Sequence, residues 1–167
     1  DTLFVDPSMK YDLRVYTLPE VVKKNIELKP AIHNIIAVDA PQGSLSISMD
    51  TRSVQIQPVA IVRKAGEMKT LNAQPLGTSQ QYLVGKYDLE ILTLPRTYME
   101  NVEVNQSTDT KIELPNVGQI TLIFGYVGNG AIFVKRNGNI EWVMDINPRA
   151  TSQTIKLLPG NYMVMYR

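Results

Sequence analysis

The sequence predicts an all-β protein made of two tandem antiparallel β-sandwiches of seven strands each. Three observations carry this prediction. A long segment repeats within the chain, apolar and polar residues alternate with period two over most of each copy, and short turn motifs separate the alternating segments. A content of 44% hydrophobic and 20% charged residues is typical of a globular protein.

An internal repeat sets the organisation of the chain. The matching segments are Tyr11–Pro19 with Tyr87–Pro95, Asn25–Leu28 with Asn101–Val104, Gly43–Met49 with Gly118–Phe124, Thr78–Gln80 with Thr151–Gln153, and Gly85–Leu89 with Gly160–Val164. A strand that begins with tyrosine therefore occurs three times, at Tyr11, Tyr87 and Tyr162. Repeats of this kind indicate that one structural unit is duplicated.

The three tyrosine strands bracket two whole units, 18–92 and 93–167. Residues 1–17 are then expected to be a strand remnant of an upstream unit, or an N-terminal strand that packs on the first domain. We expect the protein to continue upstream. The junction near Thr93–Pro95 is expected to be short and stiff, because proline fixes φ and restricts the residue before it.

Alternation places the strands of the second unit near 100–105, 108–114, 118–125, 130–136, 139–147, 152–158 and 160–167. Asn137-Gly138 predicts a type I′ hairpin turn, because both residues tolerate positive φ. Ala65-Gly66 stands at the same place in the first unit and predicts the same hairpin. Periodicity fails over 21–25 and its copy 97–101, so a loop is predicted there.

The inward positions of these strands define the expected cores. In the second unit they are Ile120, Leu122, Phe124, Ile132, Val134, Ile155, Leu157, Tyr162 and Val164. In the first unit they are Leu45, Ile47, Met49, Ile61, Leu83, Tyr87, Leu89 and Ile91. Trp142 alternates with Ile140 and Met144, which predicts that it fills the second core.

Charge and composition exclude several classes of function. Seventeen basic and 16 acidic residues give a net charge of +1, which provides no field for binding nucleic acid or an anionic membrane. There is no cysteine, so disulfides and thiolate chemistry are excluded. Neither a cofactor nor a metal is expected, because Asp50, Asp109 and Asp145 are isolated in the sequence and match no calcium loop.

No pattern in the sequence favours catalysis. His33 is the one histidine, and alternation in Ile32–Ile36 makes it the outward neighbour of buried isoleucines. Asp88 and Glu90 would share one strand face, and Glu103 and Glu113 would lie on neighbouring strands. Such carboxylates are more often a solvated surface than a glycosidase pair.

Two segments carry a resemblance to known families. Leu157–Val164, LLPGNYMV, resembles the last hairpin of prealbumin-like β-sandwich modules, which include carboxypeptidase-regulatory-like and Cna-B-type domains. Tyr87–Glu103 resembles accessory repeats of bacterial envelope proteins that carry a von Willebrand factor A-type domain. The resemblance implies a prealbumin-like or immunoglobulin-like sandwich and a periplasmic, cell-surface or secreted location. The isopeptide bond of Cna-B relatives is not expected, since the last strand offers only Asn161 at its start.

We therefore expect a non-catalytic structural or protein-binding accessory module of a larger secreted or cell-envelope bacterial protein. Its expected partners are an upstream domain of the same polypeptide and a protein or glycan ligand. The alternative is a carbohydrate-binding module that uses Tyr126, Trp142 or Tyr98 as a stacking platform, as β-sandwiches that bind sugars do. A third alternative is a receptor whose sheet edge accepts a β-strand of a partner.

Overall fold

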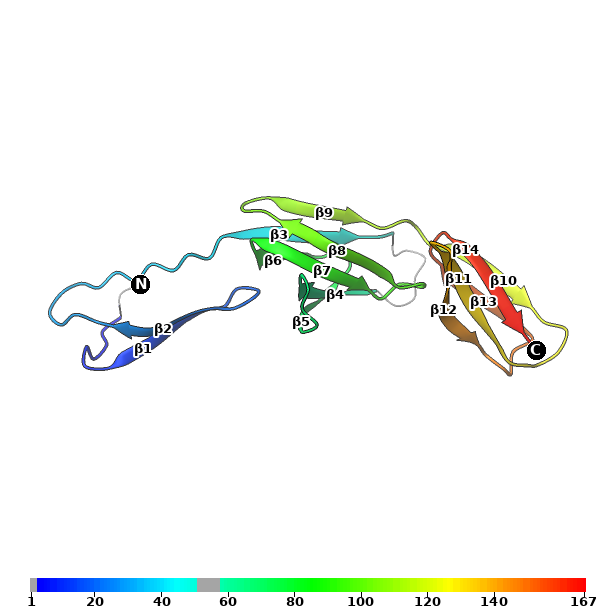
Figure 1. The fold of residues 1–167 in the computed structure, drawn as a ribbon, viewed down its shortest axis with the longest axis horizontal. Coiled ribbons are helices and arrows are strands. Elements are labelled where there is room, and N and C mark those ends of the chain that lie inside the picture. Colours follow the sequence, from blue (N-terminus) through cyan, green and yellow to red (C-terminus); the bar gives the residue numbers. More distant parts are fainter. Residues whose placement is uncertain (1–2, 51–57) are drawn as a thin grey trace.

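The computed structural model describes residues 3–50 and 58–167, and within these ranges it contains 14 strands and no helix. The prediction of an all-β protein is confirmed. Figure 1 shows a hairpin, a first sandwich and a second sandwich following one another along the molecule. The strands are β1 (Lys10–Val15), β2 (Val21–Glu27), β3 (Gln42–Ser48), β4 (Val59–Lys64), β5 (Thr70–Pro75), β6 (Ser79–Leu83), β7 (Gly85–Ile91), β8 (Thr97–Val104), β9 (Asp109–Glu113), β10 (Gly118–Ile123), β11 (Gly130–Arg136), β12 (Asn139–Ile146), β13 (Ser152–Leu157) and β14 (Asn161–Tyr166).

The first sandwich consists of the sheets β6-β3-β9 and β5-β4-β7-β8. β3 runs parallel to β9, and the other pairings in these sheets are antiparallel. Apolar side chains of both sheets meet in a closed core, which is the arrangement that buries one face of each sheet. The buried residues are Leu45, Ile47, Ala60, Val62, Leu76, Tyr82, Tyr87, Leu89, Ile91, Val104 and Ile112.

The second sandwich consists of the sheets β10-β13 and β12-β11-β14. Its core is smaller and comprises Ile132, Val134, Val143, Ile146, Ile155 and Leu157. Among the described residues it has five strands, so the expected second set of seven is not observed. The strands at 97–104 and 109–113, which the repeat assigns to the second unit, pair as β8 and β9 in the first sandwich.

The sheets therefore divide between β9 and β10 rather than at residues 92 and 93. The physical reason is that a repeat sets the length of a unit but not the point at which one sandwich ends. The tyrosine strand β7 is followed by two strands, β8 and β9, that complete the sheets formed by the strands before them. A boundary drawn directly after β7 therefore separates β7 from β8 and β9, although all three belong to one sandwich.

β1 and β2 form an isolated hairpin at the N-terminal end. Their register runs from Lys10 opposite Glu27 to Val15 opposite Val21, and the Lys10 ammonium lies 2.9 Å from the Glu27 carboxylate. By the repeat, this hairpin corresponds to β7 and β8. Whereas β7 also pairs with β4, no described strand pairs with the other edge of β1.

The loops predicted at 21–25 and 97–101 are wrong, because these residues lie in β2 and β8. Both strands contain an asparagine with φ of 56°, Asn25 and Asn101, opposite an irregularity in the pairing. The backbone N–H of Asn25 donates to Asp12 at 3.0 Å, and that of Asn101 donates to Asp88 at 2.9 Å. A bulge of this kind breaks the two-residue period without ending the strand.

The predicted core of the first unit is largely correct. Leu45, Ile47, Tyr87, Leu89 and Ile91 are buried. Ile61 does not belong to the core, because its neighbours Ala60 and Val62 face inward. Leu76, Tyr82, Val104 and Ile112 were not predicted.

In the second unit, Ile120 and Val164 are exposed by 36% and 37%, whereas their repeat equivalents Leu45 and Leu89 are exposed by 0% and 2%. Ile132, Val134, Ile155 and Leu157 are buried as predicted. Among the described residues, no strand covers the core of the second sandwich on the side where β8 and β9 cover the first.

The predicted hairpin turns are confirmed. Asn137 and Gly138 have φ of 49° and 81° and join β11 to β12. Gly66 has φ of 77° in the turn between β4 and β5.

Candidate functional site

The three aromatic candidates are exposed but do not form one platform. Trp142, Tyr126 and Tyr98 are each 61% exposed. Tyr98 lies on β8 of the first sandwich, whereas Trp142 on β12 and Tyr126 after β10 belong to the second. A single sugar site built from all three is therefore not observed.

Trp142 is not a core residue, so that prediction is wrong. The pairing of β11 with β12 shifts between Ile132 and Phe133, and this irregularity changes which residues of β12 face inward. Val143 and Ile146 are buried instead, at 6% and 2%. The indole Nε1–H of Trp142 donates to the Asp145 carboxylate at 3.0 Å, which fixes the ring at the surface.

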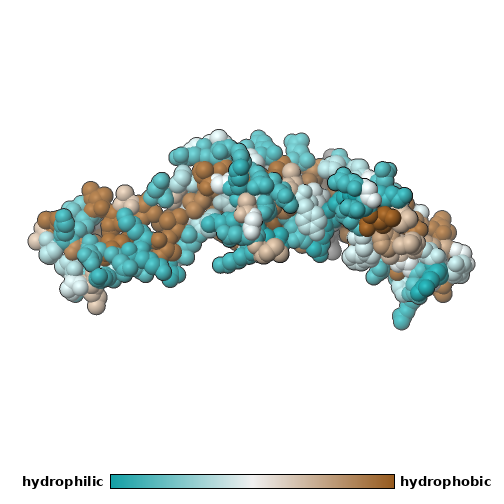
Figure 2. Space-filling model, in the orientation of Figure 1, coloured by the Kyte–Doolittle hydropathy of each residue, from teal (hydrophilic) through white to brown (hydrophobic). Residues whose placement is uncertain are grey.

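Trp142 lies on an outer apolar face of the β12-β11-β14 sheet. Across the strands it stands opposite Phe133, which stands opposite Met163. The outer apolar face comprises Ala131, Phe133, Ile140, Trp142, Met163 and Met165. Ile140 and Met165 are exposed by 54% and 49%. Figure 2 shows hydrophobic surface at this end of the molecule. Exposed apolar patches are typical of interaction sites.

The same face of the first sandwich is charged. Met163 follows Tyr162 as Asp88 follows Tyr87, and where Met163 stands opposite Phe133, Asp88 stands opposite Arg63. Sequence reasoning missed Phe133, Met163 and Met165. The available signal was the replacement of Asp-x-Glu after Tyr87 by Met-x-Met after Tyr162.

The carboxylates of Asp88 and Glu90 hold the first sandwich together. Asp88 accepts the backbone N–H groups of Asn101 and Gly66, at 2.9 and 2.8 Å, and these bonds lower its pKa. Glu90 lies 2.9 Å from the Arg63 guanidinium and also pairs with Arg96. The hydrogen bond from Arg63, with a further bond from Arg96, holds the pKa of Glu90 below its ordinary value despite burial. These contacts give both carboxylates a structural role in the first sandwich.

We expect the first sandwich to lose stability in acid through Glu90. Its pKa is lower in the folded than in the unfolded chain, so its contribution is complete above about pH 4.5 and is lost as the pH falls through the folded value. Glu90→Gln should therefore unfold at a lower temperature than the wild type at neutral pH. Calorimetry from pH 7 down to pH 3 should show the two melting temperatures converging, and a constant gap would contradict this role.

Tyr126 belongs to a small aromatic cluster at the end of β14. The Tyr166 ring stacks on Phe124 with centroids 4.1 Å apart, and its centroid lies 5.7 Å from that of Tyr126. The Tyr166 hydroxyl donates to the Tyr126 carbonyl at 2.7 Å. Tyr126 is thus held beside the apolar residues of the second sandwich, in a loop that follows β10.

A repeated joint connects neighbouring units. The backbone N–H of Leu83 donates to the Leu18 carbonyl at 2.7 Å, and that of Leu158 donates to the Leu94 carbonyl at 2.7 Å. In both cases a Thr-Leu-Pro tip of one unit meets the end of the strand that precedes the tyrosine strand in the next unit. The hydroxyl of that tyrosine, Tyr87 or Tyr162, donates to the carbonyl of the same leucine. Leu83 at the first joint, and Leu158 at the second, is thus hydrogen-bonded both to the tip of the preceding unit and to the tyrosine of its own unit.

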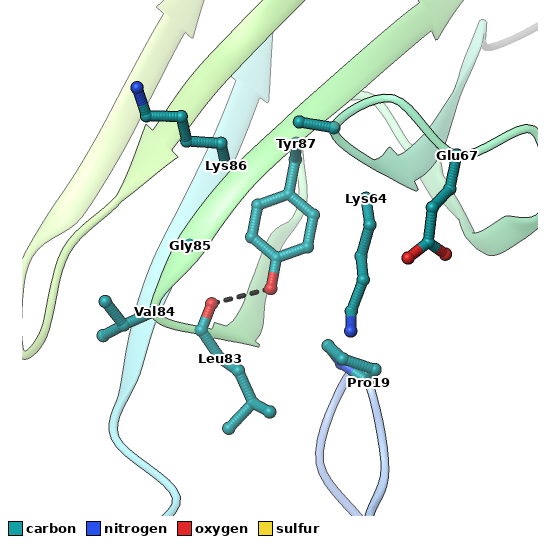
Figure 3. Close-up of a pocket in the computed structure, with 9 residues that line it drawn as sticks. Pro19, Lys64, Glu67, Leu83, Val84, Gly85, Lys86 and Tyr87 are labelled. Atoms are coloured by element: carbon teal, nitrogen blue, oxygen red, sulfur yellow. Dashed lines mark hydrogen bonds between the residues drawn. The ribbon is translucent and has the colours of Figure 1, made fainter.

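Each tip is held by its threonine. Thr17 and Thr93 are buried, and their hydroxyls donate to the carbonyls of Pro19 and Pro95 at 2.6 and 2.9 Å. Figure 3 shows Pro19 pointing at the shallow pocket formed by Lys64, Leu83 and Tyr87. Burial raises the pKa of Tyr87 to about 12, so its hydroxyl stays protonated over a wider pH range than that of an ordinary tyrosine. At the second joint the Arg136 guanidinium adds a hydrogen bond to the Arg96 carbonyl at 2.8 Å.

The other candidates for chemistry lie apart. His33 is exposed, and its neighbours Ile32 and Ile35 are exposed by 58% and 85%, so the predicted burial of these isoleucines is wrong. Over residues 3–50 and 58–167, no three His, Asp or Glu side chains are placed to hold a metal ion. In the same ranges no helix is long and apolar enough to cross a membrane.

Comparison with known proteins gives no relative: no family model, no curated protein and no solved structure matches this chain.

Proposed function

We propose that this chain is a non-catalytic structural and protein-binding accessory module of a larger secreted or cell-envelope bacterial protein, built from prealbumin-like or immunoglobulin-like sandwich units. The observation that supports a structural role is the repeated joint. The same backbone hydrogen bond, the same buried threonine and the same tyrosine occur at both junctions. A flexible linker would need none of these contacts.

A module of this kind sets the distance and direction between the parts that it joins. Each Thr-Leu-Pro tip is short and contains a proline. Its leucine carbonyl accepts a hydrogen bond from the next unit and its threonine donates one within the tip, so few backbone torsions are free at the junction. The outer apolar face of the second sandwich gives the module one surface where a partner can bind. The equivalent face of the first sandwich has its charges paired internally.

Thr93→Ala is expected to loosen the second joint. The hydroxyl of Thr93 is buried and bonds the Pro95 carbonyl, and removing it should cost about 1 kcal/mol. Because the chain has no cysteine, Ser79→Cys and Ser152→Cys can carry spin labels on equivalent exposed positions of the two sandwiches. Their distance distribution should be narrow and should broaden in Thr93→Ala.

The matched control for this measurement is Thr108→Ala. Thr108 also donates to a backbone carbonyl, that of Asn105 at 2.9 Å, but lies in the turn between β8 and β9. It should leave the distribution unchanged. A broad distribution in the parent chain would contradict a structural role for the joint.

A second candidate function, carbohydrate binding, is supported by Trp142. Its ring is exposed and fixed by Asp145 next to Phe133, an arrangement that suits stacking on a sugar. On a glycan array, binding should be lost by at least about tenfold in Trp142→Ala and retained in Tyr98→Ala. Absence of binding across the array would contradict the carbohydrate-binding function and favour a protein partner for the outer apolar face.

A further inference from the structure

The chain contains two Asn-Gly dipeptides, Asn129-Gly130 and Asn137-Gly138. An asparagine followed by glycine is open to attack on its own side chain, because glycine has no side chain that shields its backbone nitrogen. Both asparagines are exposed. The surroundings of the two dipeptides nevertheless differ, and this difference decides which of them can react in the folded protein.

Asn129 is held by the sheet. Its backbone N–H donates to the Arg167 carbonyl at 2.8 Å, and its own carbonyl accepts the Arg167 N–H at 2.8 Å. Gly130 begins β11 and pairs with both β12 and β14. A Cβ on Gly130 would lie 2.6 Å from the Met165 carbonyl oxygen, so the neighbouring backbone packs closely here. The rotation that would bring the Gly130 nitrogen to the Asn129 side chain therefore requires the sheet to open.

Asn137 and Gly138 form the exposed tip of the hairpin between β11 and β12. Over residues 3–50 and 58–167, neither the side-chain amide of Asn137 nor the backbone N–H of Gly138 has a hydrogen-bond partner. The turn after β4 differs in both respects, because Ala65 precedes its glycine and the Gly66 N–H donates to Asp88 at 2.8 Å. A hairpin tip on the outer strand of a sheet opens locally at low free energy.

The charges next to the tip favour the same reaction. Lys135 and Arg136 directly precede Asn137. The Gly138 nitrogen carries negative charge when it loses its proton and attacks. Two cations close by in the sequence lower the energy of this charge.

We propose that Asn137 is a site of spontaneous modification, at which the Gly138 backbone nitrogen attacks the asparagine side chain, and that the product loosens the second joint. The nitrogen forms a bond to the side-chain carbonyl carbon, and the side-chain nitrogen leaves as ammonia. Water then opens the resulting five-membered succinimide. Cleavage at the side-chain carbonyl gives aspartate, and cleavage at the backbone carbonyl gives isoaspartate, in which the chain runs through the side chain.

The modified turn adjoins the second joint. Arg136 donates to the Arg96 carbonyl at 2.8 Å and pairs with Asn139 across the hairpin. Isoaspartate lengthens the backbone of the turn by one carbon atom, so this pairing is lost. Aspartate instead places a carboxylate next to the Arg136 guanidinium, where it competes with the Arg96 carbonyl. The loosening rests on the proposed structural role of the joint, whereas the modification does not.

Peptide mapping by mass spectrometry, on the intact chain incubated in mildly alkaline buffer, tests the modification. We expect Asn137 to change from amide to acid at least about tenfold faster than Asn129, because only the hairpin tip opens readily. In the chain unfolded in urea the two dipeptides should react at similar rates. Ala65→Asn creates a third Asn-Gly dipeptide, with its glycine N–H bonded to Asp88, and it should react at least about tenfold more slowly than Asn137.

Spin labels on Ser79→Cys and Ser152→Cys test the effect on the joint. The distance distribution should broaden as Asn137 is converted, and Asn137→Asp should broaden it without incubation. Asn137→Gly is the matched control, because glycine suits the positive φ of this turn and has no amide to lose. After the same incubation its distribution should remain narrow.

Two results would overturn the inference: equal rates at Asn129 and Asn137 in the folded chain, or an unchanged distance distribution once Asn137 is converted. A broad distribution in the fresh chain would contradict the proposed function and the loosening together. The mass spectra would still decide the modification, so the two failures are distinguishable.

Discussion

Replacing Gly43 with alanine is expected to destabilise the first sandwich by roughly 3 kcal/mol. The added Cβ would lie well inside contact distance of the Asn105 carbonyl oxygen and 3.0 Å from Val104 Cγ1. The neighbouring backbone cannot easily move away. The Ser107 N–H donates to the Gln42 carbonyl at 2.9 Å, and the Ser44 N–H donates to the Thr108 carbonyl at 2.8 Å.

The matched substitution is Gly118→Ala at the equivalent place in β10. Its Cβ meets only ordinary van der Waals contact, so the stability of the monomer should change by less than about 0.5 kcal/mol. Native-state hydrogen exchange can assign the loss in Gly43→Ala to β3, β8 and β9. Fluorescence of Trp142, the only tryptophan, reports on the second sandwich alone and should change little. Similar unfolding of the two variants would show that the corner of β8 and β9 does not press on β3.

Strand positions were predictable from the sequence because alternation and turn residues are local signals. The turn at Asn137-Gly138 needs two residues with positive φ, so the identity of these two residues is enough to predict it. β2 and β8 were missed for an equally local reason, since the bulges at Asn25 and Asn101 interrupt the period. The sequence did contain the signal, because Asp12 and Asp88 repeat together with their asparagines.

The grouping of strands into sandwiches was not predictable in the same way. Which sheet β8 and β9 join depends on packing between residues far apart in sequence, such as Leu45, Val104 and Ile112, which share one core. The orientation of Trp142 was missed because the irregularity between Ile132 and Phe133 shifts the inward positions of β12. A shift of one residue moves a side chain to the opposite face, so a single bulge converts a predicted core residue into an exposed one.

Gln74→Ala is expected to destabilise the first sandwich by about 3 kcal/mol, although it removes a polar side chain. Gln74 is 1% exposed and lies among apolar residues of the core. Its amide Nε2 donates to the Leu45 carbonyl at 2.8 Å and to the Thr78 carbonyl at 2.9 Å. Its Oε1 accepts the hydroxyl proton of Tyr82 at 3.0 Å.

The effect arises from the groups left behind. Without Gln74 the Tyr82 hydroxyl, itself in a fully buried residue, loses its acceptor, and the buried Leu45 carbonyl and the part-buried Thr78 carbonyl each lose a donor. A buried polar group without a partner costs about 1–3 kcal/mol, more than a hydrogen bond contributes when both partners can reach water. The side chain also fills space between β3 and β5, so alanine would leave a cavity as well.

A double variant separates the two contributions. Tyr82→Phe removes the hydroxyl that donates to Gln74 and should by itself cost about 1–2 kcal/mol, since the Gln74 Oε1 is then unpaired. In Gln74→Ala/Tyr82→Phe the hydroxyl and its lost acceptor disappear together, so the combined loss of unfolding free energy should be smaller than the sum of the two single losses. Gln81→Ala, at an exposed position of β6, is the control and should change stability by less than about 0.5 kcal/mol. Additive single and double losses in chemical denaturation would show that the hydrogen bond is not what couples Gln74 to Tyr82, and that the cavity alone accounts for the destabilisation.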